Sequence, residues 1–229
     1  MTRLARMVIP GLPHHVTQRG NRREAIFFEN GDHEIYRDML AEQLRKSSVE
    51  VWAYCLMPNH LHLILNPQQS DLMGRALGEA HRRYTNFINA RGRWTGHLFQ
   101  SRLASVAMDE SHLRAAVSYV SLNPVRARLV SGAEEWAWSS VRAHLAGEDD
   151  GLVSVRPVLD RWPNFRDLLL QDYDEAFTSL RKAEGIGRPL GTADFVIELE
   201  RRLGRPIARR APGRKATATP QGEQLKLLQ

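Results

Sequence analysis

The pattern of apolar and polar positions predicts alternating strands and helices over roughly the first two-thirds of the chain. β-Prone runs occupy residues 13–19, 49–56, 60–65 and 103–108. Apolar residues recur at helical spacing over residues 32–44, 71–90 and 111–120. The order is strand, helix, hairpin, helix, strand, helix. We therefore predict an α+β fold of ferredoxin-like type, in which helices pack on an antiparallel sheet.

Residues that cap or break helices set the expected ends of these elements. Asp32 and Asp109 stand where capping side chains are favoured, and Gly92 stands where the second helix should end. The turn Met57-Pro58-Asn59 joins the two strands of the hairpin. Pro124 lacks an amide hydrogen, so we expect the third helix to end close to it.

Composition divides the chain into three parts. Residues 1–147 hold the predicted α+β domain, and Glu148-Asp149-Asp150-Gly151 begins a helical extension over residues 148–204. Within this extension we expect helices over 160–182 and 192–203. Residues 205–229 are rich in Arg, Pro, Gly, Ala and Thr, a composition typical of a disordered tail.

Apolar runs and cysteine usage limit the class of protein. No run reaches the roughly 20 apolar residues of a membrane span, and the first residues lack the apolar stretch of a secretory signal. Cys55 is the only cysteine, which excludes an internal disulfide and a cysteine-based zinc cage. We therefore expect a cytoplasmic protein with no membrane partner.

Positive charge is concentrated at both ends of the chain. The formal net charge is +6. Residues 1–24 carry five arginines against Glu24, and residues 201–229 carry eight arginines and lysines against Glu223. The rest of the chain is therefore net acidic. Such segregation is typical of proteins that contact nucleic acid, although two solvated basic tails would give the same distribution.

Two histidines share one face of the predicted strand 60–65. Side chains alternate along a strand, so His60 and His62 point one way and Leu61 and Leu63 point the other. Two adjacent imidazoles suit a divalent metal ion. Polar residues on the wet face of a half-buried strand would produce the same pattern, so the pair alone does not establish a metal site.

A tyrosine and an asparagine share one face of the third predicted helix. Tyr119 and Asn123 are four residues apart, which makes them neighbours on a helix surface. Asn123 offers an oxygen as a third metal ligand, and Tyr119 offers a phenol that becomes nucleophilic when it loses its proton. Taken singly, Tyr119 could simply pack on the sheet, and Asn123 could simply end the helix before Pro124.

Five segments occur along residues 3–147 in a distinctive order. They are Pro13-His14-His15-Val16-Thr17-Gln18-Arg19-Gly20-Asn21, Met57-Pro58-Asn59-His60-Leu61-His62, Gly96-His97-Leu98-Phe99-Gln100-Ser101-Arg102, Tyr119-Val120-Ser121-Leu122-Asn123-Pro124-Val125-Arg126-Ala127 and Trp138-Ser139-Ser140. Together these segments resemble the REP-associated tyrosine transposases, which are single-tyrosine members of the HUH nuclease superfamily (IS200-like).

The resemblance implies a metal-dependent endonuclease and strand transferase that acts on single-stranded, hairpin-forming repeat DNA. His60, His62 and Asn123 would hold Mg²⁺ or Mn²⁺, and Tyr119 would be the nucleophile that forms a 5′-phosphotyrosine intermediate. The protein would act as a monomer or a homodimer. A domesticated relative that binds hairpin DNA without cutting it is the alternative, and so is an RNA-binding protein with the same sheet topology. An RNA binder would need exposed aromatic residues where the histidines stand.

Four other tyrosines compete with Tyr119 for the role of nucleophile. Tyr84 is the strongest rival because Arg82 and Arg83 precede it, but it has no ligand-type residue one turn away on its own face. Tyr54 lies in the strand opposite the histidines. Tyr36 and Tyr173 have the spacing of core residues in amphipathic helices.

Several polar residues are candidates for DNA contacts. Each could equally be a solvated surface side chain. His15 is a candidate either for stabilising the sheet near the site or for an ordinary structural role. Trp136 and Trp138 could stack on bases or pack the closing segment of the domain. The candidate DNA-binding residues are Arg19, Asn21, Arg22, Arg23, Arg82, Arg83, Arg102 and Arg126.

Overall fold

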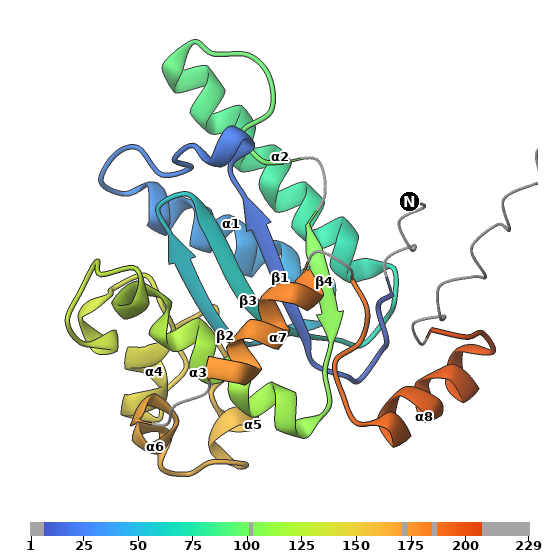
Figure 1. The fold of residues 1–229 in the computed structure, drawn as a ribbon. Helices are drawn as coiled ribbons and strands as arrows, with labels where there is room; N and C mark the ends of the chain where they lie inside the picture. Colours follow the sequence, from blue (N-terminus) through green and yellow to red (C-terminus); the bar gives the residue numbers. More distant parts are fainter. Residues whose placement is uncertain (1–6, 101–102, 171–173, 185–186, 208–229) are drawn as a thin grey trace, which may run out of the picture.

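A four-stranded antiparallel sheet forms the centre of the protein (Figure 1). The structure, a computed structural model, describes residues 7–100, 103–170, 174–184 and 187–207. The sheet has the strand order β2-β3-β1-β4, and every neighbouring pair is antiparallel. Its strands are β1 (His14–Arg19), β2 (Val49–Met57), β3 (His60–Pro67) and β4 (Ala104–Ala107). This order confirms the predicted α+β fold of ferredoxin-like type.

Helices cover both faces of the sheet. Two of them, α1 (Asp32–Lys46) and α2 (Leu72–Gly92), pack on one face, while α3 (Glu110–Arg126) and α7 (Asp174–Glu184) lie across the other (Figure 1). The remaining elements are η1 (Asn21–Arg23), η2 (Ala133–Glu135), α4 (Val141–Ala146), α5 (Arg156–Leu159), α6 (Phe165–Leu170) and α8 (Ala193–Leu203).

Strand β3 divides its side chains between two hydrophobic cores. Leu61, Leu63 and Leu65 are fully buried with residues of α1 and α2. Ile64 points the other way and packs with residues of α3. The predicted alternation along β3 is therefore correct, but the face that carries the histidines is covered by α3 and is not a wet face.

The third helix ends close to Pro124, as predicted, although Val125 and Arg126 still belong to it. Pro124 lies inside α3, which ends at Arg126. The amide of Ala127 donates to the carbonyl of Asn123 at 2.9 Å, so the helical hydrogen bonds resume directly after the proline. Proline removes only the bond to Val120, and its fixed φ is compatible with helical geometry. At the other end, Asp109 caps α3 as predicted, with its side chain accepting from the amide of His112.

Asp32 is not the expected helix cap. It is the first residue of α1 and follows the N-cap Gly31. Its buried carboxylate accepts from the amides of Phe28 and Glu29, at 2.8 and 3.0 Å, and is bound by both terminal nitrogens of Arg91, at 2.7 and 2.9 Å. The carboxylate therefore joins the loop before α1 to the end of α2 instead of satisfying the first amides of its own helix.

The helical extension is more broken than the sequence indicated. The stretch expected as one helix over 160–182 contains a turn around Pro163, then α6, then α7. Pro163 accounts for the first break because proline disfavours helical geometry in the residue before it. The helix expected over 192–203 is present as α8. Most of the predicted disordered tail, residues 208–229, lies outside the described residues. In the described part, no helix is both long enough and apolar enough to span a bilayer.

Replacing Asp32 should strongly destabilise the fold. In Asp32→Ala, Arg91 and two loop amides lose a fully buried partner, so the free energy of unfolding should fall by about 3 kcal/mol. Urea unfolding would measure this loss. Glu34→Ala, in the same helical turn but exposed, is the control and should change stability by less than about 0.5 kcal/mol. Equal effects of the two substitutions would contradict the role given to Asp32.

Candidate active site

The two histidines of β3 lie side by side beneath α3. His60 and His62 point to the same face of the sheet, with ring centroids 4.9 Å apart and ring planes at 80°. His62 pairs in register with Thr17 of β1, and His60 pairs with Arg19. His62 is 1% exposed, whereas His60 lies nearer the surface at the end of the strand. The pair therefore runs from the edge of the site into its interior.

Hydrogen bonds leave one nitrogen of each ring available. His60 Nδ1 lies 2.7 Å from Asn59 Oδ1, which can only accept, so Nδ1 carries the proton and Nε2 has the lone pair. His62 Nδ1 lies 3.0 Å from His15 Nε2. His62 Nε2 is buried and has no hydrogen-bond partner among the described residues. Metal-bound histidines typically have their second nitrogen held by another polar group, which is the arrangement found here.

Both rings are held in the neutral form that a metal ligand requires. Burial, with a smaller contribution from the charge of Arg19, lowers the pKa of His60 to about 4. Burial also lowers the pKa of His62 well below its usual range, and the neighbouring His15 adds to this effect. Neutral imidazole has a nitrogen lone pair at pH 7, so neither histidine would have to lose a proton before it bound a cation.

Helix α3 brings Tyr119 against the histidines. The Tyr119 ring meets His62 edge-to-face at 5.4 Å between centroids, and meets His15 in the same way at 5.9 Å. Asn123 follows one helical turn later and is buried, and its Nδ2 atom has no hydrogen-bond partner in the described part of the chain. Because the two ends of an amide are assigned from their surroundings, either end of Asn123 can face a ligand.

The remaining described tyrosines have structural partners away from the histidines. Tyr84 is fully buried in the core between α1 and α2, and its hydroxyl donates to the carbonyl of Ile26 at 2.8 Å. Tyr36 bonds to His81 in the same core, and Tyr54 donates to Asp150. Tyr173 lies outside the described residues. Of the described tyrosines, Tyr119 is the one beside the histidine pair.

An aromatic and a cationic side chain cover Tyr119. Phe177 of α7 packs on the Tyr119 ring at 5.2 Å between centroids, and the guanidinium of Arg126 lies over both rings, at 5.1 and 4.8 Å. Tyr119 is consequently 5% exposed. The sequence indicated Arg126, which is seven residues after Tyr119 and so on the same helix face. Phe177 carried no such signal because it is far away in the chain.

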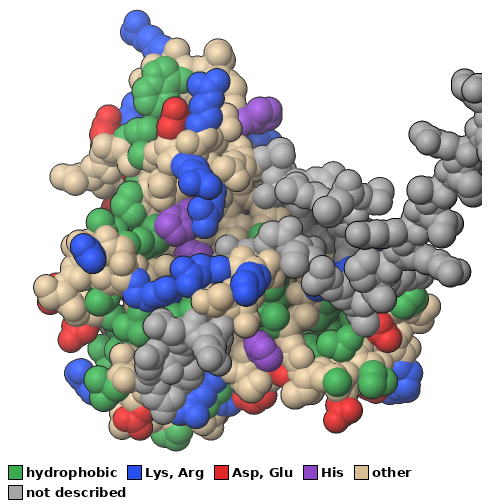
Figure 2. Space-filling view, viewed as in Figure 1, with side chains coloured by type: hydrophobic (Ala, Val, Ile, Leu, Met, Phe, Trp, Pro, Cys, Tyr) green, Lys and Arg blue, Asp and Glu red, His purple; other side chains and the backbone are tan. Residues whose placement is uncertain are grey.

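The described candidate DNA-binding arginines lie in three places: at the histidine site, in η1 and on α2. Arg19 and Arg126 lie at the histidine site, where their charges act on His62. Figure 2 shows lysine and arginine side chains beside histidines near the middle of this face. Arg22 and Arg23 are exposed in the η1 segment that starts at Asn21.

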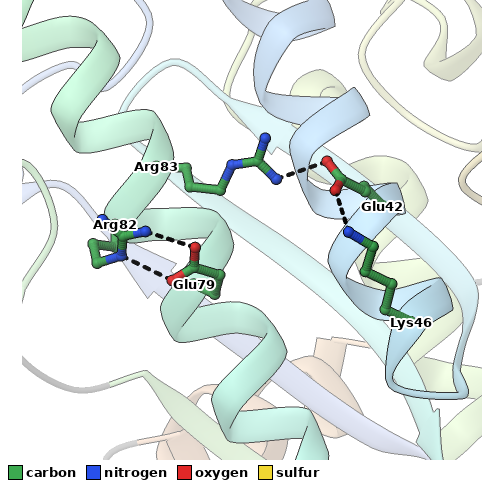
Figure 3. Close-up of polar contacts among 5 residues, drawn as sticks. All are labelled: Glu42, Lys46, Glu79, Arg82 and Arg83. Carbon is green, nitrogen blue, oxygen red and sulfur yellow. Dashed lines mark hydrogen bonds and ion pairs between the residues drawn. The ribbon is translucent and has the colours of Figure 1, made fainter.

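Helix α2 carries the other arginines in the candidate set, and acidic residues engage them. Arg82 forms two bonds to Glu79, at 2.7 and 2.8 Å, and Arg83 pairs with Glu42 of α1 at 2.7 Å (Figure 3). Arg83 therefore contributes to the contact between two helices. Arg102 lies outside the described residues.

The tryptophans named as candidates for base stacking are packed instead. Trp136 donates its indole N–H to the carbonyl of Leu56 at 3.1 Å. Trp138 stacks on His33 at 4.6 Å between centroids. Both therefore have the packing role that the sequence left open.

Within the described residues, no group of three or more His, Cys, Asp and Glu side chains is arranged to hold a metal ion. The candidate set is of a different kind, because its third member is the amide of Asn123. The fit therefore depends on the available nitrogens of His60 and His62 and on the unpaired amide atom of Asn123.

Comparison with known proteins defines the class of protein to which this fold and site belong. The sequence model of the family described as "Transposase IS200 like" matches residues 9–123, half of the chain, and this segment includes His60, His62, Tyr119 and Asn123. The chain therefore belongs to the IS200-like transposase family.

A solved structure shares the fold. A REP-associated tyrosine transposase bound to a REP hairpin is 23% identical, with a TM-score of 0.55 over 68% of this chain and 90% of that one. A protein of Deinococcus radiodurans R1 assigned as a transposase is 22% identical, with a TM-score of 0.37 over 50% and 91% of the two chains. No curated protein matches the chain.

The buried histidines should make the fold sensitive to mild acid. Burial lowers the pKa of five imidazoles to about 4: His14, His15, His33, His60 and His81. Above about pH 6.5 both the folded and the unfolded chain hold them neutral, so their contribution to stability is fully present. As the pH falls from 6.5 towards 4, only the unfolded chain takes up protons, and the free energy of unfolding should decrease.

Thermal unfolding between pH 7 and pH 5 would test this expectation. Tm should fall steadily across the range. A constant Tm would mean that these imidazoles can be protonated in the folded state, and that the neutral form of His60 is not imposed by the fold.

Proposed function

We propose that the protein is a metal-dependent endonuclease and strand transferase for single-stranded, hairpin-forming DNA, with Tyr119 as its nucleophile. The observation that carries the proposal is the contact between the Tyr119 ring and His62, at 5.4 Å between centroids, on the face where His60 and His62 both have an available nitrogen. Membership of a transposase family supports DNA as the substrate.

His60, His62 and Asn123 would hold the divalent ion, Mg²⁺ or Mn²⁺. When bound, such an ion would polarise the scissile phosphate and stabilise the negative charge that develops on its oxygens. His15 would fix the orientation of His62 through the bond between their rings, and Asn59 would do the same for His60. The protein residues therefore supply both the ligands and their support.

Tyr119 would carry out the covalent step. Its phenolic oxygen would form a bond to phosphorus while the bond from phosphorus to the 3′ oxygen breaks. The phenol loses its proton, and the leaving 3′ oxygen gains one. The products are a 5′-phosphotyrosine and a free 3′-hydroxyl, and attack by another 3′-hydroxyl reverses the step and rejoins two strands.

Arg126 would help the phosphate to reach Tyr119. Its guanidinium covers the Tyr119 and Phe177 rings. A phosphate offers this guanidinium two charged oxygens in a matched geometry, which is a stronger interaction than a contact with an aromatic face. Arrival of the phosphate would therefore draw Arg126 away from the ring and expose the phenol beside the bound anion.

Hairpin DNA is the substrate that the comparisons favour. The REP-associated transposase of similar fold is bound to a REP hairpin. In this chain, Arg22 and Arg23 are exposed next to the end of β1, where they could contact phosphates. The likeness to that structure extends only to the fold, so the hairpin is part of the proposal.

Substitution of Tyr119 is the direct test of the nucleophile. Wild-type protein incubated with end-labelled hairpin oligonucleotides and Mn²⁺ should form a protein–DNA adduct that survives denaturant. Tyr119→Phe keeps the aromatic packing and should form none. Tyr84→Phe, which changes a buried structural tyrosine in the same way, is the control and should still form the adduct. An adduct in Tyr119→Phe would refute the assignment, and no adduct with any hairpin would favour a binder that does not cut.

Substitution of the ligands separates cleavage from binding. His60→Ala and His62→Ala should each lower the cleavage rate by at least about 100-fold. Binding of the same hairpin without added metal should change little, because the phosphate contacts remain. Glu34→Ala, which alters an exposed side chain of α1 away from the site, is the control and should cleave normally. Full cleavage by either substituted ligand would exclude a metal site at that residue.

A further inference from the structure

A long groove with amide, arginine and histidine side chains in its walls runs along α2, on the face of the sheet opposite to the histidines of β3. It encloses about 1150 Å³. One wall is a single face of α2 from Gly74 to Asn89, and the other wall includes the end of β1 and residues 96–100. Gln18 lines this groove, whereas its neighbour Arg19 points to the histidine face, because side chains alternate along β1. The groove is therefore separate from the candidate active site.

Chemistry and size suit this groove to a polar polymer. Small-molecule pockets enclose about 300–1000 Å³. This groove is larger, and several amide side chains line it. Among the described residues, no aspartate or glutamate lines it, while Arg22, Arg82 and His97 do. The Nε and Nη2 groups of Arg82 donate hydrogen bonds to Glu79, and its Nη1 group can donate to another acceptor.

Packing against the described residues does not require the glycine in the middle of α2. Gly78 is exposed in the groove wall, and a Cβ atom at this position would meet nothing within 4 Å. Glycine inside a helix is less favourable than alanine. With no neighbouring atom that requires it, glycine here leaves room for a ligand to approach the helix backbone closely.

Two exposed aromatic rings stand at one end of the groove. Phe28 and Trp94 are 42% and 52% exposed, and their rings meet edge-to-face at 5.3 Å between centroids. They line a second hollow that shares Asn21, Asn89 and His97 with the groove, so the two are continuous. Glu24 borders this aromatic end.

The position of Trp94 depends on the end of α2. A Cβ atom at Gly92 would come within 2.7 Å of the indole, so only glycine at this position lets the ring fold back over the last turn of the helix. The ring is therefore held in place by the backbone while one of its faces stays available. Solvent-exposed aromatic rings beside basic residues are the usual platforms for unpaired nucleic-acid bases.

We propose that an unpaired strand of DNA lies in the groove along α2, with a base stacked on the Phe28–Trp94 pair. The inference rests on the proposed function only for the identity of the ligand as DNA. It adds a second binding site, on the face opposite to Tyr119, that holds the single-stranded flank of a hairpin and takes no part in the covalent step. RNA would present similar bases, but membership of a transposase family favours DNA.

Binding of labelled oligonucleotides to the full chain, in EDTA so that no cleavage occurs, tests this site. The probes are a DNA hairpin with an unpaired flank of roughly 10 nucleotides, the same hairpin with blunt ends, and the RNA form of the first. The flanked DNA hairpin should bind most tightly. Trp94→Ala and Phe28→Ala should each weaken its binding by about 5- to 100-fold and leave the blunt hairpin unaffected. Trp94→Phe should recover much of the loss.

Two further variants keep the test decisive if an aromatic substitution disturbs the fold. Gly78→Gln should raise Tm by about 2 °C, because it replaces a helical glycine, and should still weaken binding of the flanked hairpin by filling the groove. Ile197→Ala, an exposed apolar position on α8, is the matched control and should bind as wild type does. The flank should also crosslink to the peptide containing Trp94 when 5-iododeoxyuridine replaces its thymidines.

The outcomes separate this proposal from the proposed function. If Trp94→Ala and Gly78→Gln bind the flanked hairpin as tightly as Ile197→Ala does, the groove is not the site, whatever the Tyr119 adduct assay shows. Tighter binding of the RNA form would overturn DNA as the ligand. If the groove variants lose binding and no hairpin forms an adduct, the groove proposal stands and the nucleophile assignment falls. No binding of any probe by the wild-type protein would refute both.

Discussion

The pairing of β1 with β3, between two hydrophobic cores, is the constraint on which the site depends. The register sets Thr17 against His62 and Arg19 against His60, which places His15 diagonally beside His62. Leucines at alternate positions of β3 anchor the opposite face to α1 and α2. A shift of one residue would bury the histidines among those leucines, so the apolar core fixes which face carries the imidazoles.

Burial of these imidazoles under α3 then has an electrostatic consequence. Inside the protein a charged imidazolium loses its water, and the nearby charge of Arg19 adds to the penalty. The rings stay neutral, and the cationic side chains remain around them. A site that keeps neutral nitrogen donors next to arginines can accept a metal ion and a phosphate together, because the negative phosphate offsets both positive partners.

The parts of the protein that could be predicted from the sequence were governed by local pattern. The alternation along β3 and the four-residue spacing of Tyr119 and Asn123 each depend on one element, and both held. The error at Asp32 came from a side chain with a distant partner. Asp32 has the sequence context of a cap, yet its carboxylate binds Arg91, 59 residues away.

The same distinction explains the elements that the sequence did not reveal. Phe177 reaches Tyr119 only because α7 folds back across α3, and no periodic pattern encodes that contact. Among the tryptophans, sequence reasoning considered Trp136 and Trp138, which proved to be packed, and overlooked Trp94. The exposure of Trp94 depends on its ring folding back over Gly92 at the end of α2, and this contact is visible only in the three-dimensional structure.

The two faces of the sheet present different chemistry because of where their acidic residues lie. Arg82 and Arg83 of α2 are paired with Glu79 of the same helix and Glu42 of α1 (Figure 3). A surface ion pair of this kind is weak and exchanges readily for a phosphate. Over Tyr119, by contrast, Arg126 has aromatic rings as its close partners. Phosphate can therefore compete for arginines on both faces, but only on the histidine face would its arrival also uncover Tyr119, the proposed nucleophile.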